Sequence, residues 1–388
     1  MKTRYRAASI AMLALCVMAV TAWQSTGAPS QQDETSAAQT SMRGIFFTLT
    51  MVYTLSLDAE QYEDPVNNAQ IHGGLQALVA NASELERHGA GLNPSYGYFR
   101  RSLANDAQDA LTRFNEGQYM GSRFVVGKMT ENCVSCHTKL PYEQDFDLGA
   151  EFINKSKIRK LKPEERVQIE LALRQFETAL ATYDELFAEP EMSPENLALL
   201  GAFSGSMRLC VGAMDDPQRA AATLKKYGRR ADLSAMFKTQ LDGWIDALES
   251  ADMNAAAGNE LASARELINT AEAARSNPAD RSGLVDYIIG STLLNRYVES
   301  NPSNETELAE AFYLMGVAES RINRSYWVSE TDYLLDQAIR TAPKSEVARQ
   351  AYAFLAEYTI SAHAETSARE VSPDMRADLE ELRKLIEE

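Results

Sequence analysis

The residues of this sequence best suited to chemistry are two cysteines and a histidine in the segment ENCVSCHT. Cys133 and Cys136 are separated by two residues, and His137 directly follows the second cysteine. This spacing is used by one half of a structural zinc site, by a redox-active dithiol and by the attachment site of a covalent haem. Other features of the sequence are needed to discriminate between these three kinds of site.

A zinc site is not favoured because further ligands are scarce. Structural zinc takes four ligands, usually supplied as two pairs. Beyond the motif and the N-terminal leader, the sequence offers Cys210 alone and three well-separated histidines, His72, His88 and His363. Cys210 lies in the apolar segment SMRLCVGAM, which predicts a buried structural thiol.

A thioredoxin-like dithiol is not favoured either, since it belongs to an α/β unit and this sequence shows no strand pattern. A covalent haem suits each residue of the motif. The thiols of Cys133 and Cys136 would add to the porphyrin vinyl groups, and His137 would give its imidazole to the iron. Apolar residues recur on the same helical face at Val126, Met129 and Leu140.

The element that holds the motif is predicted to be the last of four helices. Apolar residues recur at helical spacing over residues 42–62, 67–89, 94–117 and 118–140, and Pro or Gly residues separate these segments. Short connections between such helices predict an antiparallel four-helix bundle over residues 42–142.

Residues 143–388 are also predicted to be helical, so the expected fold class is all-α. Residues 162–190 predict one long amphipathic helix with Pro163 in its first turn. Residues 309–345 come close to the small and large residue pattern of a tetratricopeptide helix pair, with about three extra residues between the helices. The pattern rests on Phe312, Met315, Gly316, Leu335, Ala338 and Pro343. An irregular helical domain is the alternative to this TPR-like solenoid.

The N-terminus predicts export. Basic residues at positions 2, 4 and 6 precede an apolar run over residues 7–20 and small residues up to position 22, the pattern of a signal peptide over residues 1–22. An uncleaved anchor helix is the alternative. Residues 23–41 are small and polar, which predicts a flexible leader. No later segment is long and apolar enough for stable membrane insertion, so the mature chain is expected in the periplasm, where haem attachment to thiols takes place.

The net charge of the chain indicates which classes of partner it can bind. The chain carries 55 acidic and 38 basic residues, a net charge of −17. Such a surface repels nucleic acid and favours a redox partner with a basic docking face. The oligomeric state is left open.

The motif in this setting resembles the cytochrome c-prime and c-556 group over residues 42–141, roughly a quarter of the chain. The resemblance implies thioethers at Cys133 and Cys136 and an axial ligand at His137. That group often has an arginine in its first helix, followed four residues later by an apolar residue over the distal haem face. Arg43 and Phe47 match this spacing.

The resemblance fails just after the motif. The group commonly has a basic residue four positions after the histidine, and this chain has Pro141 there, with Lys139 as an imperfect substitute. This departure concerns propionate or surface electrostatics and leaves haem attachment unaffected.

The sixth iron ligand is left open by the sequence. Met51 would favour electron transfer, whereas Phe47 over the iron would leave a five-coordinate site, and His72 is a further option. His88 is expected at a helix C-terminus, where it suits the helix dipole, and His363 is expected to be structural or exposed. In an ordinary small cytochrome c the ligand would come from a later loop, as Met192 could, but a long charged helix intervenes.

The sequence therefore predicts a periplasmic monohaem c-type cytochrome. It would transfer electrons through one covalent haem c and would not be an enzyme, and its C-terminal helices would form a docking domain. A five-coordinate protein that binds or senses gases is the alternative. A haem peroxidase is disfavoured because no distal acid–base pair is recognisable.

Overall fold

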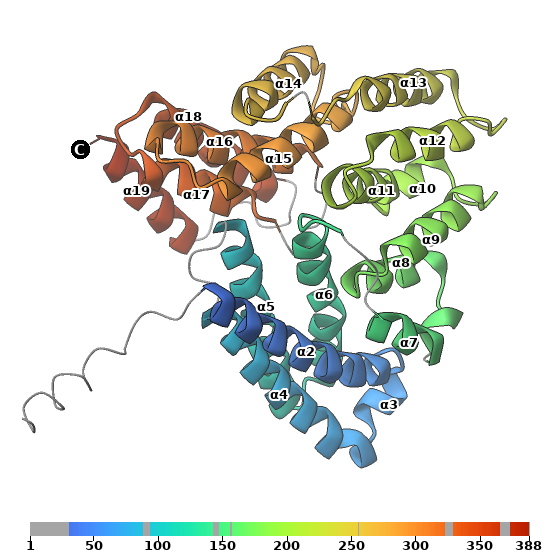
Figure 1. The fold of residues 1–388 in the computed structure, drawn as a ribbon. Helices are drawn as coiled ribbons and strands as arrows, with labels where there is room; N and C mark the ends of the chain where they lie inside the picture. Colours follow the sequence, from blue (N-terminus) through green and yellow to red (C-terminus); the bar gives the residue numbers. More distant parts are fainter. Residues whose placement is uncertain are drawn as a thin grey trace, which may run out of the picture.

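The computed structural model describes residues 31–87, 94–142, 147–155, 157–254, 256–322, 329–364 and 373–387 (Figure 1). Within these ranges the regular elements are all helices and there is no strand, so the prediction of an all-α fold is confirmed. The signal segment, His88 and the side chain of His363 lie outside the described residues. None of the described helices is long and apolar enough to cross a membrane.

The first four long helices pack around one hydrophobic core, which we call the bundle. They are α2 (Gln31–Ser56), α4 (Asn68–Arg87), α5 (Pro94–Asn115) and α6 (Tyr119–His137). Between α2 and α4 the chain turns through α3 (Ala59–Glu63) and η1 (Pro65–Asn67), whose starts are capped by Asp58 and Asp64. Gly117, with φ 76°, takes the left-handed conformation that closes the short turn from α5 to α6.

The start of α2 differs from the prediction. Residues 31–41 belong to this helix, although residues 23–41 were expected to form a flexible leader. The segment continues the buried face of the helix, since Ser41 is buried and Ala38 packs against the bundle core. Its Gln, Glu and Ala residues tolerate helix well, so tertiary packing extends the helix into a polar sequence.

The remaining helices form an arc over the end of the bundle at which α6 finishes (Figure 1). In Figure 1 they ascend on the right from α7 to α13, cross the top at α14 and α15, and descend on the left to α19. Their bounds are α7 (Asp147–Lys155), η2 (Lys157–Lys160), α8 (Pro163–Ala172), α9 (Phe176–Ala188), α10 (Pro194–Leu199), α11 (Ala202–Arg208), the π-helical turn η3 (Leu209–Ala213), α12 (Pro217–Tyr227), α13 (Ala235–Ser250), α14 (Glu260–Ala274), α15 (Leu284–Glu299), α16 (Glu305–Ile322), α17 (Thr331–Thr341), α18 (Glu346–Ala364) and α19 (Pro373–Glu387).

The long helix predicted over residues 162–190 is interrupted. It starts with Pro163 as expected, but α8 ends at Ala172 and α9 begins at Phe176. Arg174 between them has φ 55°, and the Gln175 N–H donates to the Glu170 carbonyl at 2.8 Å. A left-handed residue cannot continue an α-helix, so the amphipathic pattern here belongs to two helices.

The segment with the tetratricopeptide pattern forms α16 and α17. Phe312, Met315, Leu335 and Ala338 are all buried there. A Cβ on Gly316 would lie 2.9 Å from the Leu335 side chain, so the two helices approach closely at this glycine. The resemblance to a tetratricopeptide repeat remains a prediction.

Candidate functional site

The motif occupies the last two turns of α6. Cys133, Cys136 and His137 follow one another at helical spacing, and the helix ends at His137. The chain then continues in tight turns, with the Lys139 N–H donating to the Cys136 carbonyl at 3.1 Å. The three side chains therefore project from one side of a helix C-terminus, as the predicted helical position requires.

Both motif thiols are in apolar surroundings. Cys136 is buried and clusters with Tyr96 and Phe99 of α5, while Cys133 packs against the bundle core. Burial raises the pKa of Cys133 to about 12 and that of Cys136 to about 11. Redox-active and catalytic cysteines have lowered pKa values and often lie at helix N-termini. This pair lies at a helix C-terminus, so the structure argues against a reactive dithiol.

The His137 ring is held in one tautomer. Its Nδ1 lies 2.9 Å from the carbonyl oxygen of Ala172, and because a carbonyl can only accept, Nδ1 must carry the proton. Burial, with a smaller contribution from the nearby Arg174 guanidinium, lowers the pKa of His137 to about 4. The ring is thus neutral near pH 7, and Nε2 carries the free lone pair that a metal ion needs.

The interruption after α8 supplies this acceptor. The last carbonyls of a helix have no partner within it, and Ala172 is the last residue of α8. Orienting a ligand histidine through a hydrogen bond from its other ring nitrogen to a carbonyl is a general feature of metal sites. The hydrogen bond from His137 to Ala172 is a contact of this kind.

The structure adds no support to the hypothesis of a zinc site. In the part of the chain that the structure describes, no three His, Cys, Asp or Glu side chains come together to hold a metal ion. Cys210 is buried in the core of the C-terminal helices, as predicted, and its thiol pKa is raised to about 12 by burial.

Lys139 forms a buried ionic cluster with three residues of the C-terminal helices. Its Nζ forms ion pairs with Glu330 and, at 3.5 Å, with Glu319. Arg208 contacts the other oxygen of Glu319 at 3.1 Å. Although burial opposes it, Arg208 and Lys139 hold the pKa of Glu319 at about 2, whereas burial raises the pKa of Glu330. Lys139 is therefore paired within the protein. Its imperfect substitution for the basic residue of the c-prime group stays a prediction.

Further contacts join α5 to the C-terminal helices α15 and α17 and to the residues just before α17. The Tyr96 hydroxyl donates to Glu299 Oε1 at 2.5 Å, and the Tyr98 hydroxyl donates to the Ser329 carbonyl at 2.7 Å. The Tyr98 ring also stacks on Tyr333, with centroids 5.2 Å apart. Sequence reasoning missed all of these C-terminal partners, since no motif marks them. The surroundings of the motif thus extend beyond the predicted boundary at residue 142.

The residues considered for the distal side lie on α2 and α4. The terminal methyl of Met51 would be 2.6 Å from a Cβ on Gly74, so Met51 packs into the space that this glycine leaves. Phe47 is 59% exposed, Arg43 is exposed and His72 is half-buried. Met192 packs against the C-terminal core. The identity of the sixth ligand stays a prediction.

Comparison with known proteins adds no relative to this picture. No protein-family model matches the chain, and neither a characterised protein nor a solved structure is detectably similar to it.

Proposed function

We propose that this protein is an exported c-type cytochrome that transfers electrons. Cys133 and Cys136 would bind one haem through thioether links, and His137 would be the axial ligand. The observation that carries the proposal is the hydrogen bond from His137 Nδ1 to Ala172 at the end of a C-x-x-C-H motif. When bound, the haem supplies iron that alternates between the ferric and ferrous states.

The protonation states of the three residues suit this role. A thioether is neutral and apolar, so the burial that opposes a thiolate at Cys133 and Cys136 does not oppose the product of attachment. The aromatic rings of Tyr96 and Phe99 beside Cys136 provide an apolar wall. A neutral His137 requires no proton loss before it can ligate.

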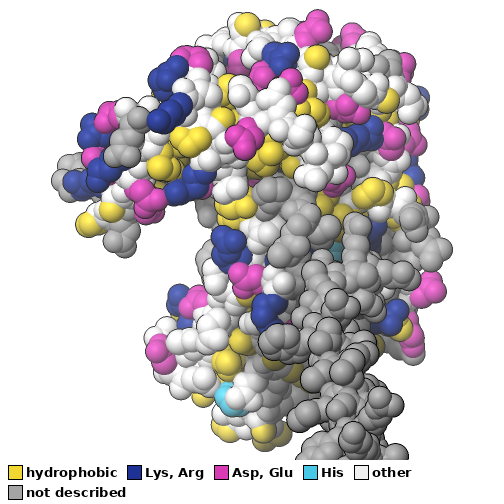
Figure 2. Space-filling model, turned by 60° about the vertical axis from the view of Figure 1, so that its left-hand side comes forward, with side chains coloured by type: hydrophobic (Ala, Val, Ile, Leu, Met, Phe, Trp, Pro, Cys, Tyr) yellow, Lys and Arg dark blue, Asp and Glu magenta, His cyan; other side chains and the backbone are white. Residues whose placement is uncertain are grey.

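The rest of the proposal rests on the sequence. The basic and apolar N-terminal segment supports export to the periplasm, and the net charge of −17 supports a redox partner with a basic docking face. Acidic and basic side chains are interspersed on the described part of the face shown in Figure 2. The resemblance to the c-prime group supports a haem-carrying bundle, and the C-terminal helices would form the docking scaffold.

Haem attachment is tested by expressing the chain, with its leader, in cells that attach haem to exported proteins. The denatured protein should keep its haem through acid–acetone extraction and on a denaturing gel. Cys133→Ala and Cys136→Ala should each weaken or abolish the covalent signal, and Cys210→Ala is the matched control that should leave it intact. A colourless product with both motif thiols open to alkylation after denaturation would refute the proposal.

A five-coordinate haem that binds gases is the second candidate. It is favoured by the packing of Met51 against Gly74, which engages the methionine between α2 and α4. Absorption spectra of the ferrous protein with and without carbon monoxide discriminate between the two. A low-spin spectrum unaffected by the gas supports electron transfer, and a high-spin spectrum that changes supports gas binding.

A further inference from the structure

A cavity, which we call the groove, runs along the side of α6 that faces away from the motif thiols. It has a volume of about 690 Å³ and is bounded by α6, α8, α9, α10 and α11. Its residues on α6 and just after it recur every three or four positions and so share one helix face, namely Phe124, Lys128, Glu131, Ser135 and Thr138. Cys133 and Cys136 pack against the bundle core and α5 instead. The groove is therefore separate from the place of haem attachment.

The groove has an apolar mouth. Phe124 on α6 is 54% exposed, and Leu199 and Leu200 in the same lining are 70% and 44% exposed. Single exposed apolar residues are ordinary, but several around one concave site mark a surface that a ligand covers. The volume of the groove falls in the range of about 300–1,000 Å³ that small-molecule sites occupy.

A buried tyrosine hydroxyl lies in the wall of the groove. Tyr183 on α9 lines the groove although it is only 2% exposed. A Cβ on Gly205, which also lines the groove, would clash with the Tyr183 hydroxyl, so this oxygen lies beside the glycine. In the part of the chain that the structure describes, no other group hydrogen-bonds to this hydroxyl. Burial raises the pKa of Tyr183, which keeps the proton on the oxygen, so the groove presents a hydrogen-bond donor for a ligand to complete.

The charged groups that line the groove do not attract an anion. Lys128 is paired with Glu131 at 2.6 Å, and Arg208 is paired with Glu319 at 3.1 Å. The further charged side chain in the lining is the carboxylate of Glu164, in the first turn of α8, where the helix dipole stabilises it. An uncharged ligand fits these surroundings best.

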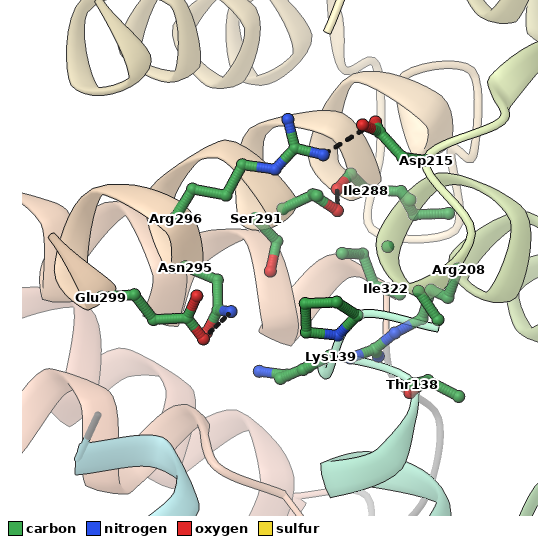
Figure 3. Close-up of a pocket in the computed structure, with 14 residues that line it drawn as sticks. Thr138, Lys139, Arg208, Asp215, Ile288, Ser291, Asn295, Arg296, Glu299 and Ile322 are labelled. Atoms are coloured by element: carbon green, nitrogen blue, oxygen red, sulfur yellow. Dashed lines mark hydrogen bonds and ion pairs between the residues drawn. The ribbon is translucent and has the colours of Figure 1, made fainter. Parts of the chain in front are cut away.

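The inner end of the groove meets a smaller cavity between η3, α15 and the residues after α6 (Figure 3). This cavity has a volume of about 180 Å³, and Thr138, Arg208 and Ile322 line it as well as the groove. Figure 3 shows Arg296 pointing toward Asp215, with which it is paired at 2.8 Å. The smaller cavity therefore adds no unpartnered guanidinium at Arg296, and a ligand of the groove gains no ionic contact there.

We propose that the groove binds an uncharged apolar compound that carries a carbonyl oxygen, which is the chemistry of a quinone. The carbonyl would accept a hydrogen bond from the Tyr183 hydroxyl, and the apolar body would lie against Phe124 and Leu199. The groove ends at Thr138, which directly follows His137, so the site adjoins the motif. A redox role for the bound quinone rests on the proposed function, whereas its binding does not.

The test is equilibrium dialysis of the purified full chain, with and without attached haem, against duroquinone. Every ring carbon of this probe that a thiol could attack carries a methyl group. We expect saturable binding to both forms of the protein. Tyr183→Phe removes one hydroxyl from a packed ring and should weaken binding about fivefold, because one hydrogen bond is lost. The same variant should leave binding of durene, which lacks the carbonyl oxygens, unchanged.

The apolar mouth is tested with Leu199→Ser, which should weaken binding of duroquinone several-fold. Met236→Ser is the matched control, because Met236 is 83% exposed on α13 and does not line the groove. The haem-free chain tests the site even if the protein attaches no haem.

Four results would each overturn the proposal. The first is the absence of saturable binding of duroquinone to the haem-free chain. The second is an unchanged affinity in Tyr183→Phe, which would show that this hydroxyl meets only water. The third is equal binding of trimethylbenzoate, an anion of similar size. The fourth is loss of binding when haem is attached, which would show that the haem itself fills the groove.

Discussion

At the scale of single residues, burial sets the chemistry of the motif. The same apolar surroundings raise the pKa of two thiols and lower that of an imidazole, so Cys133, Cys136 and His137 are all neutral near pH 7. Neutral groups suit thioether formation and metal ligation, whereas a dithiol that exchanges electrons needs a stabilised thiolate. The protonation states of the motif are therefore compatible with the proposed haem attachment and disfavour a redox-active dithiol.

Slow alkylation of the thiols follows from these pKa values. In folded protein made without haem, Cys136 should react with iodoacetamide at pH 8 about a hundredfold more slowly than a free cysteine, because its pKa of about 11 leaves little thiolate. The rate should rise steeply as the pH approaches 11. The guanidinium-unfolded protein is the control and should react at the ordinary rate. Fast labelling of the folded protein at pH 8 would show that the thiols are not buried.

At the scale of elements, a break between two helices and a close contact between two others position the residues around the motif. The interruption after α8 exposes the Ala172 carbonyl to His137. The approach of α16 to α17 at Gly316 brings together the helices on either side of Glu330. Each of these two contacts depends on one residue. The close approach of α16 and α17 can be tested by adding one methyl group at Gly316.

Two glycine substitutions should have opposite effects on stability. Gly316→Ala places a Cβ 2.9 Å from the Leu335 side chain, and such overpacking should lower the free energy of unfolding by about 1–3 kcal/mol. Gly243→Ala on α13 meets nothing within 4 Å, and it should raise the free energy of unfolding by up to about 1 kcal/mol. Urea unfolding followed by circular dichroism measures both. A destabilised Gly243→Ala variant would indicate that helix propensity does not govern this site.

At the scale of the whole molecule, the C-terminal helices complete the motif's surroundings. Lys139 lies two residues after His137 and is ion-paired with Glu319 and Glu330 from the distant end of the chain. Tyr96 and Tyr98 make further hydrogen bonds across the same junction. The bundle and the arc of helices are therefore expected to unfold together.

Removing the positive charge of Lys139 should lower the free energy of unfolding. Lys139→Met leaves Glu319 and Glu330 buried with one fewer positive charge, and a broken buried pair costs about 3–5 kcal/mol. The double variant with Glu330→Gln should recover part of that loss, because it removes the uncompensated carboxylate. Chemical unfolding of the two variants and of the single Glu330→Gln control gives the coupling energy. If the changes in unfolding free energy of the two single variants simply add up in the double variant, the ion pair between Lys139 and Glu330 does not contribute to stability.

Acid should destabilise the protein through Glu319. Its pKa of about 2 in the folded state lies below the ordinary value, so its contribution is complete above about pH 4.5 and is lost as the pH falls toward 2. The raised pKa of Glu330 acts in the opposite direction and limits the net change. Unfolding free energies at pH 6, 4 and 3 should fall less steeply for Glu319→Gln than for the unsubstituted protein. Equal slopes would exclude this carboxylate as a source of acid sensitivity.

Local pattern was enough to predict much of the fold. Helical spacing, Pro and Gly boundaries and the C-x-x-C-H spacing located α4, α5 and α6 within a few residues and the motif at a helix end. These features depend on neighbours within one or two helical turns, which a sequence displays directly. Residues 31–41 were not predicted as a helix because they are polar and lack an apolar period, whereas the structure shows them in α2, with Ala38 packed on the bundle core and Ser41 buried.

Only the tertiary structure decided what surrounds the motif. The contact of the Ala172 carbonyl with His137 and the pairing of Lys139 with Glu319 and Glu330 both join segments far apart in the chain. Such contacts depend on how whole helices pack, and the side chains involved are ordinary surface types when read in sequence. The protonation of the motif residues, and with it their chemistry, follows from that packing.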